Sequence, residues 1–152
     1  MSPASWAEFE AAQPEMAAAG RRLLYQFGPG LGFLATVRAD GGPRVHPVCP
    51  HIGEGELWVF VGAGSPKFAD LARDGRFALH SFPCPDVDDE FYVTGVATQY
   101  ADSRREARVR ASLPFNSSGD DPPFVLSLER ALLSTYGPRP TFPPVYTKWS
   151  AI

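Results

Sequence analysis

The sequence predicts a mainly β protein of the α+β class, an antiparallel barrel or sandwich with a few short helices. Stretches of strand composition follow one another closely between residues 31 and 100, and the connections between them are short and rich in Gly, Pro and Asp. Helical patterns are confined to the N-terminus and to two short stretches farther along. Such closely spaced hairpins favour a barrel or sandwich over a doubly wound sheet.

Size and composition describe one ordinary globular domain. A chain of 152 residues with 20% charged residues and a formal net charge of -3 can bury a real core but not a separate catalytic domain. No basic surface suits nucleic acid, and no polybasic or long apolar run suits a membrane, so we expect neither partner. The N-terminus does not resemble a signal peptide, and Cys49 and Cys84 are predicted to be free thiols. We therefore expect a cytoplasmic protein.

Residues 1–28 carry helical signals. Ser5 and Glu8 have the spacing of a capping box, which predicts a helix from Trp6. Pro14 interrupts this helix, and a second helical stretch ends at Gly28-Pro29-Gly30. We expect these helices to cover one end of a barrel and to carry no chemistry.

Residues 31–133 are predicted to form the barrel. Asp40-Gly41-Gly42-Pro43 has the composition of a hairpin turn, and Gly95 allows a bend or bulge. Pro47 and Pro50 place their strand at a sheet edge, because proline has no N–H for the ladder. The expected strands cover residues 31–39, 44–52, 57–61, 76–82, 89–100 and 124–133.

Two further helices are predicted, at 66–73 and at 103–112, the second with Ser103 and Glu106 as its capping box. Residues 114–123 form a loop that is either a lid or an inert connector. The tail, 134–152, is rich in proline and aromatic residues. Its aromatic side chains, Phe142, Tyr146 and Trp149, are expected to pack on a partner or beside a ligand.

A candidate anion site follows the strand that ends at Val61. The Gly62-Ala63-Gly64 turn leaves no side chain in the way, Ser65 is placed as an N-cap, and Pro66 suits the first helical position. Lys67 adds an ammonium group to the free N–H groups of the helix N-terminus, a set that fits a phosphate monoester. The alternative is an ordinary capped helix with a solvated lysine. The spacing matches neither a Walker loop nor a dinucleotide fingerprint.

Other chemistry finds less support. His46 and His51 lie five residues apart, so in an unbroken strand they face opposite sides and cannot share an ion, and we expect no metal site. No serine or cysteine lies in a nucleophile elbow. The acidic turn between Asp86 and Glu90 is expected to be a solvated loop. An anion site beside proline-bearing and aromatic strands favours a protein whose cofactor carries the chemistry.

Three segments resemble the pyridoxamine 5'-phosphate oxidase-like, FMN-binding split-barrel family: FLATVRADGGPRVHPV, LWVFVGAGSPKFADLARDGRFAL and EFYVTGVA, within about residues 31–101. The resemblance implies a six-stranded antiparallel split β-barrel. It also implies a homodimer with two cofactor sites at the subunit interface, and places the tail at that interface.

The resemblance further implies the cofactor-binding residues. They comprise the flavin-contacting strand, a contact pair on the next strand, the phosphate-binding turn and one acidic residue where the oxidases have a glutamine; we add one tail aromatic. The full set is His46, Pro47, Val48, Cys49, Pro50, His51, Phe60, Val61, Ser65, Pro66, Lys67, Glu90 and Trp149.

Three hypotheses follow. The first is an FMN-dependent oxidoreductase that moves a hydride to or from a small substrate; pyridoxamine phosphate oxidation itself is not predicted, because the family's substrate-phosphate residues have no counterpart here. The second replaces FMN with its deazaflavin relative at the same Ser65 and Lys67. The third is a flavin- or haem-binding protein without turnover, in which His46, His51 or His80 is an axial ligand.

Overall fold

The computed structural model describes residues 2–117 and 121–152. The elements follow in the order α1 (Trp6–Ala12), α2 (Pro14–Leu24), β1 (Gly32–Val37), β2 (Pro43–Val48), β3 (His51–Gly53), β4 (Glu56–Phe60), α3 (Pro66–Arg73), β5 (Arg76–Ser81), β6 (Glu90–Gln99), α4 (Ser103–Ala111), β7 (Pro123–Thr135) and β8 (Val145–Ser150).

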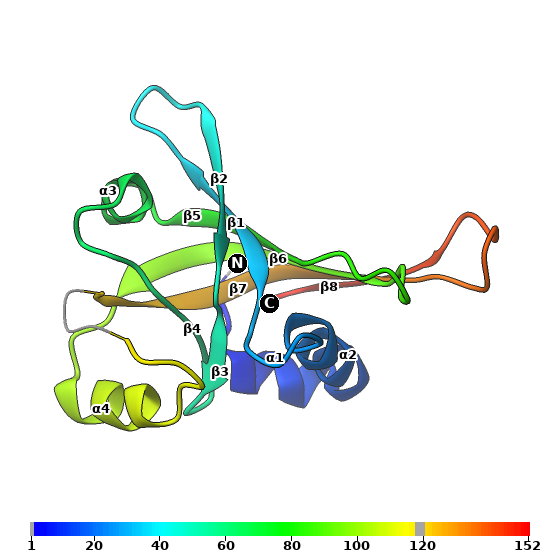
Figure 1. Cartoon of the computed structure of the whole chain (residues 1–152), viewed down its shortest axis with the longest axis horizontal. Coiled ribbons are helices and arrows are strands. Elements are labelled where there is room, and N and C mark those ends of the chain that lie inside the picture. The colour runs from blue at the N-terminus through cyan, green and yellow to red at the C-terminus, as the bar shows by residue number, and fades with distance from the viewer. Residues whose placement is uncertain (1, 118–120) are drawn as a thin grey trace.

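The strands form one antiparallel sheet that curls into a half-barrel (Figure 1). Its order is β2-β1-β5-β6-β7-β4-β3, and β8 pairs with β7. The neighbours in sequence β2 and β3 therefore lie at opposite edges of the sheet. Cys49 and Pro50 carry the chain from one edge to the other, so the edge position predicted from the prolines is confirmed.

The predicted strand number was wrong, because the structure has eight strands rather than six. The strand expected at 44–52 is two strands, β2 and β3, broken at Cys49 and Pro50. The tail supplies the other addition: β8 pairs along β7 from Thr135↔Val145 to Arg130↔Ser150. Of the loop expected at 114–123, residues 118–120 lie outside the described residues, and Pro123 already belongs to β7.

The N-terminal capping box is confirmed. The Glu8 N–H donates to the Ser5 hydroxyl oxygen at 3.1 Å, and the Ser5 N–H donates to the Glu8 carboxylate at 2.7 Å. The second predicted box was wrong, since the N-cap of α4 is Asp102, whose carboxylate accepts from the N–H groups of Arg104 and Arg105. Among the described residues, no helix is long and apolar enough to cross a membrane.

The core lies between the concave sheet and the two N-terminal helices, α1 and α2, which pack against β4, β6 and β7. Trp6 and Phe9 of α1 contact Phe91 of β6 edge-on and face-on. Trp149 of β8 packs on Phe9 with ring centroids 5.0 Å apart. The tail is thus anchored to the chain's own core, which accounts for Trp149 without a ligand.

The bend expected at Gly95 is confirmed as a register shift in the β6–β7 pair. Thr94 lies opposite Arg130, whereas Gly95 lies opposite Leu128, so one residue of β7 is unpaired there. A Cβ atom on Gly95 would lie 1.9 Å from the Ser127 carbonyl oxygen. Only glycine permits the two backbones to approach so closely.

We predict that Gly95→Ala lowers the free energy of unfolding by about 2–4 kcal/mol, because the methyl group meets backbone that cannot rotate away. Gly64→Ala is the matched control, since a Cβ atom there meets nothing within 4 Å. Urea unfolding of both variants measures the difference. Equal stability of the two would contradict the account of the bulge.

Candidate functional site

The turn before α3 has the local structure that the sequence predicts. Ser65 is the N-cap: its hydroxyl accepts from the Phe68 N–H at 3.3 Å and donates to the Gly62 carbonyl at 2.8 Å. Pro66 occupies the first helical position. The Ser65 hydroxyl already donates one hydrogen bond and accepts another within the turn. An anion bound here would therefore be held mainly by Lys67 and by the free N–H groups at the helix N-terminus.

Lys67 forms no hydrogen bond or ion pair with any residue of the described chain. Its side chain is half-buried at the second helical position of α3. A positive charge at the N-terminus of a helix is destabilising, because it lies at the positive end of the helix dipole. The same arrangement favours the binding of an acidic ligand.

His46 lies across the sheet edge from this turn. It stands opposite Leu34 of β1, which is fully buried, so the imidazole faces the inner side of the half-barrel. Its Nε2 is buried and has no hydrogen-bond partner among the described residues. Burial lowers the pKa of His46, and the positive charges of Lys67 and Arg44 lower it further. The ring is therefore neutral at pH 7, is influenced by the charge of Lys67, and has one unsatisfied nitrogen.

A buried carboxylate fixes the two residues relative to each other. Asp70 of α3 has 2% of its surface exposed and accepts from Thr36 of β1 at 2.8 Å, Arg44 of β2 at 2.7 Å and Arg73 at 3.3 Å. This network joins the helix that carries Lys67 to the hairpin that carries His46. Figure 1 shows where α3 and the β1–β2 hairpin lie in the fold. Burial raises the pKa of Asp70, but the hydrogen bonds from Arg44, Thr36 and Arg73 outweigh it, and the net shift is downward.

We predict that Asp70→Asn lowers the free energy of unfolding by about 3 kcal/mol at pH 7, because it leaves the arginines without their carboxylate. The folded pKa of Asp70 lies below its unfolded value of about 3.9, so its stabilisation is present above that value and lost as the pH falls through the folded pKa.

The gap in stability between Asp70→Asn and the native protein should therefore narrow from pH 7 to pH 3. Urea unfolding at several pH values measures it, with Asp86→Asn, an exposed carboxylate, as the control. A gap that stays constant with pH would show that the charge of Asp70 does not stabilise the fold.

The other predicted residues near this turn are placed differently. Val61 is fully buried in the core, so only its backbone could meet a ligand, and its N–H already donates to Pro122 at 3.1 Å. Phe60 is half-buried beneath the guanidinium group of Arg110, 4.6 Å from the ring centroid. On the edge strand, Val48 packs against the core, whereas Pro47 and Cys49 are exposed.

Both ring nitrogens of His51 face hydroxyl groups of the same chain, so this geometry does not favour His51 as an axial ligand, and that role stays a prediction. His51 is 8% exposed, and its two ring nitrogens lie 3.4 Å from the Tyr25 hydroxyl and 3.0 Å from the Ser112 hydroxyl. The Tyr25 oxygen also accepts from the Ile52 N–H at 2.7 Å. Burial, with a smaller effect from Arg21, lowers the pKa of His51, which keeps the ring neutral within this chain of hydrogen bonds.

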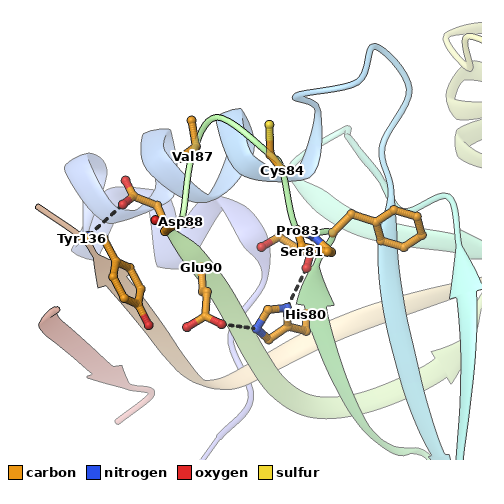
Figure 2. Close-up of a pocket in the computed structure, with 10 residues that line it drawn as sticks. His80, Ser81, Pro83, Cys84, Val87, Asp88, Glu90 and Tyr136 are labelled. Atoms are coloured by element: carbon orange, nitrogen blue, oxygen red, sulfur yellow. Dashed lines mark hydrogen bonds and ion pairs between the residues drawn. The ribbon is translucent and has the colours of Figure 1, made fainter. Parts of the chain in front are cut away.

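His80 and Glu90 lie on the other side of the sheet. His80 stands opposite the partly exposed Phe33 of β1, and Glu90 precedes the buried Phe91, so both side chains point outward. Together with Tyr136 they line a cavity of about 280 Å³, shown in Figure 2. Within one chain, Glu90 and His46 are therefore on different faces of the sheet, and a cofactor contact of Glu90 stays a prediction.

The curled antiparallel sheet, with α3 packed against β1 and β6, has the architecture of a split barrel. The sequence pattern of the pyridoxamine 5'-phosphate oxidase family matches residues 21–129. The chain therefore belongs to the pyridoxamine 5'-phosphate oxidase family. No curated protein matches it in sequence.

Several solved structures share the fold. A haem-binding protein from Mycobacterium smegmatis is 20% identical with a TM-score of 0.66, covering 88% of this chain and 57% of that protein. HutZ, a haem storage protein from Vibrio cholerae, is 15% identical with a TM-score of 0.59, and the match covers 77% of this chain and 89% of HutZ. ChuZ from Campylobacter jejuni is 10% identical with a TM-score of 0.66, and the match covers 84% of this chain and 57% of ChuZ. The chain thus spans little more than half of the first and third proteins.

Proposed function

We propose that this chain binds a planar cofactor that carries an acidic group. The acidic group lies at the turn of residues 62–67, and the planar ring lies beside the edge strand β2. The observation that carries the proposal is the buried, unsatisfied His46 Nε2 on the hairpin that Asp70 ties to α3, the helix that carries the unpaired cation of Lys67. A buried polar atom without a partner costs about 1–3 kcal/mol, and a bound ligand would supply the partner.

Two kinds of cofactor share this chemistry. FMN and its deazaflavin relative carry a phosphate, and haem carries propionates; either acid can pair with Lys67 and the N–H groups of α3. Both have a flat ring that fits an exposed edge strand interrupted by prolines. The anion site alone does not distinguish them.

The unsatisfied nitrogen of His46 favours haem binding without turnover. Neutral imidazole nitrogen is a common axial ligand of haem iron. Of the three histidines, His51 uses both ring nitrogens, and His80 lies on the outer face, whereas His46 has a free nitrogen on the inner face. Two proteins of the same fold are described as binding or storing haem.

Flavin binding is the reading that the family favours. A flavin would supply hydride transfer, and the residues of this chain would bind and orient it. Lys67 would hold the phosphate, and His46 would hydrogen-bond a polar edge of the ring. The protein would then be an oxidoreductase acting on a small substrate other than pyridoxamine phosphate.

Titration of the protein with FMN and with haemin, followed by absorption spectra, tests the proposal. We expect Lys67→Ala to weaken binding of the acidic cofactor at least about tenfold, the value of one charge-assisted hydrogen bond. Lys148→Ala is the matched control, because this second lysine is exposed on β8.

His46→Ala identifies the cofactor. Loss of the shift in the main haem absorption band with His46→Ala, but not with His80→Ala, would assign haem; tight FMN binding by the native protein would assign a flavin. Equal binding by Lys67→Ala and the native protein, or no uptake of either cofactor, would refute the site.

We also propose that a second copy of the chain covers the outer face of β1, β2 and β5. One cross-strand row on this face consists of Val45, Ala35 and Ala78, and the next row contains Pro47 and Phe33. Val45 is 61% exposed, and Phe33 is 38% exposed. Exposed apolar rows of this kind are typical of an interface.

A homodimer in light scattering is the expected result for the native protein, and Val45→Glu should yield monomers, because the new charge would be buried at the interface. Thr135→Glu, at an exposed position of β7, is the control. A native monomer, or a Val45→Glu dimer as tight as the native one, would overturn the placement.

A further inference from the structure

We infer that the chain of hydrogen bonds through Tyr25, His51 and Ser112 is a pH-sensitive latch. It holds the edge strand β3 and the C-terminal end of α4 in place at neutral pH and releases them when the solution is acidified. The inference rests on the direction of these hydrogen bonds, on the burial of the His51 ring and on the charges around it.

The hydrogen bonds of the latch run in one direction. The Ser112 hydroxyl donates to the Val109 carbonyl at 2.8 Å, so its oxygen accepts from the Nε2–H of His51 at 3.0 Å. The Nδ1 of the neutral ring then bears the lone pair, and it accepts from the Tyr25 hydroxyl at 3.4 Å. The Tyr25 oxygen in turn accepts from the Ile52 N–H at 2.7 Å. Every hydrogen atom of the chain has an acceptor in this arrangement, whereas the opposite tautomer would leave the Tyr25 hydroxyl without one among the described residues.

A second proton on His51 disrupts this arrangement. Nδ1 becomes a donor that faces the Tyr25 hydroxyl, whose oxygen already accepts from the Ile52 N–H, and the hydrogen of that hydroxyl loses its acceptor. The new charge would also be buried, because His51 is 8% exposed.

The elements around His51 provide no carboxylate that pairs with it in the described part of the chain. From α2, the positive charge of Arg21 opposes protonation, and burial raises the pKa of the Tyr25 hydroxyl, which stays neutral. From β4, the uncharged Trp58 lies opposite His51. The charged groups of α4 and of the β3–β4 hairpin pair with one another: Arg108 with Glu54 at 2.9 Å, and Arg105 with Glu56 at 3.6 Å.

The latch holds two elements with few other anchors. Among the described strands, β3 pairs only with β4, and the Tyr25 hydroxyl binds the Ile52 N–H of this edge. Ser112 is the C-cap of α4, and Val109 is the one buried residue within this described helix. Elements that bury so little apolar surface open more readily than the core, so loss of the hydrogen bonds to His51 should free them first.

The released end of α4 adjoins the turn before α3. Arg110 donates to the Asp121 carbonyl at 2.7 Å, and the Val61 N–H donates to the Pro122 carbonyl at 3.1 Å. A carboxylate oxygen of Asp121 would lie 3.3 Å from a Cβ atom on Gly62. Acidification would therefore loosen one side of the 62–67 turn, but the latch itself does not depend on cofactor binding there.

Amide hydrogen exchange of the native protein between pH 7.5 and pH 5, without added cofactor, tests the latch. Each rate, divided by the intrinsic rate at the same pH, gives the equilibrium constant for opening. With an ordinary histidine pKa of about 6.5 in the open state, this constant should rise by up to about thirtyfold at pH 5 for the Ile52 and Ser112 amides together. The Ala97 N–H, which donates to the Gly75 carbonyl at 2.7 Å, is the internal control and should not change.

His51→Gln keeps a donor for Ser112 but cannot be charged, so its opening constants should not change with pH. His80→Gln, the same replacement on the outer face of the sheet, should retain the native pH dependence. Opening constants of the native protein that do not change with pH, or a pH dependence that persists in His51→Gln, would overturn the inference.

Nitrogen-15 NMR of the His51 ring in the native protein tests the direction of the hydrogen bonds without a substitution. At pH 7.5 we expect a protonated Nε2 and a bare Nδ1. The opposite tautomer, or a doubly protonated ring at this pH, would overturn the inference as well.

Discussion

The Asp70 carboxylate is the constraint on which the geometry of the proposed cofactor site depends. It is buried where α3 meets the β1–β2 hairpin, and Thr36, Arg44 and Arg73 satisfy it. A buried carboxylate persists only when its hydrogen bonds are complete, so the helix and the hairpin can adopt few other relative positions. Lys67 and His46 extend from these same two elements. Their proximity is therefore a consequence of packing around one charge.

The alternation of side chains along the strands separates His46 and His80 between the two faces of the sheet. His46 faces the inner side of the half-barrel, whereas His80 and Glu90 face outward, because side chains alternate along β2, β5 and β6. Proline in β2 leaves an edge without a full ladder, and the break at Cys49 and Pro50 sends the chain to the other edge. The long β7–β8 ribbon completes the outer cavity by carrying Tyr136 beside Glu90 (Figures 1 and 2).

Local signals predicted much of the fold. The bounds of α3, the caps at Ser5 and Ser65, the bulge at Gly95 and the edge position of β2 each depend on neighbouring residues, so sequence alone reveals them. Long-range pairing is different: Tyr25 and Ser112 lie 26 and 61 residues from His51, and no pattern signals their contact. The strand β8 was missed because the segment just before it is rich in proline and because its own exposed aromatic residues are typical of a loop. No sequence pattern predicts that Thr36 and Arg44 donate hydrogen bonds to Asp70, because the residues meet only when the hairpin packs against α3.

The central claim is that one ligand contacts both the unsatisfied His46 nitrogen and the Lys67 ammonium group. Nitrogen-15 NMR of the imidazole and lysine side chains, recorded as FMN or haemin is added, tests it most directly. The account predicts that the signals of His46 Nε2 and Lys67 Nζ shift or broaden together, at the same cofactor concentration, while those of His51 and Lys148 stay in place. Changes at only one of the two groups, or at neither, would contradict it.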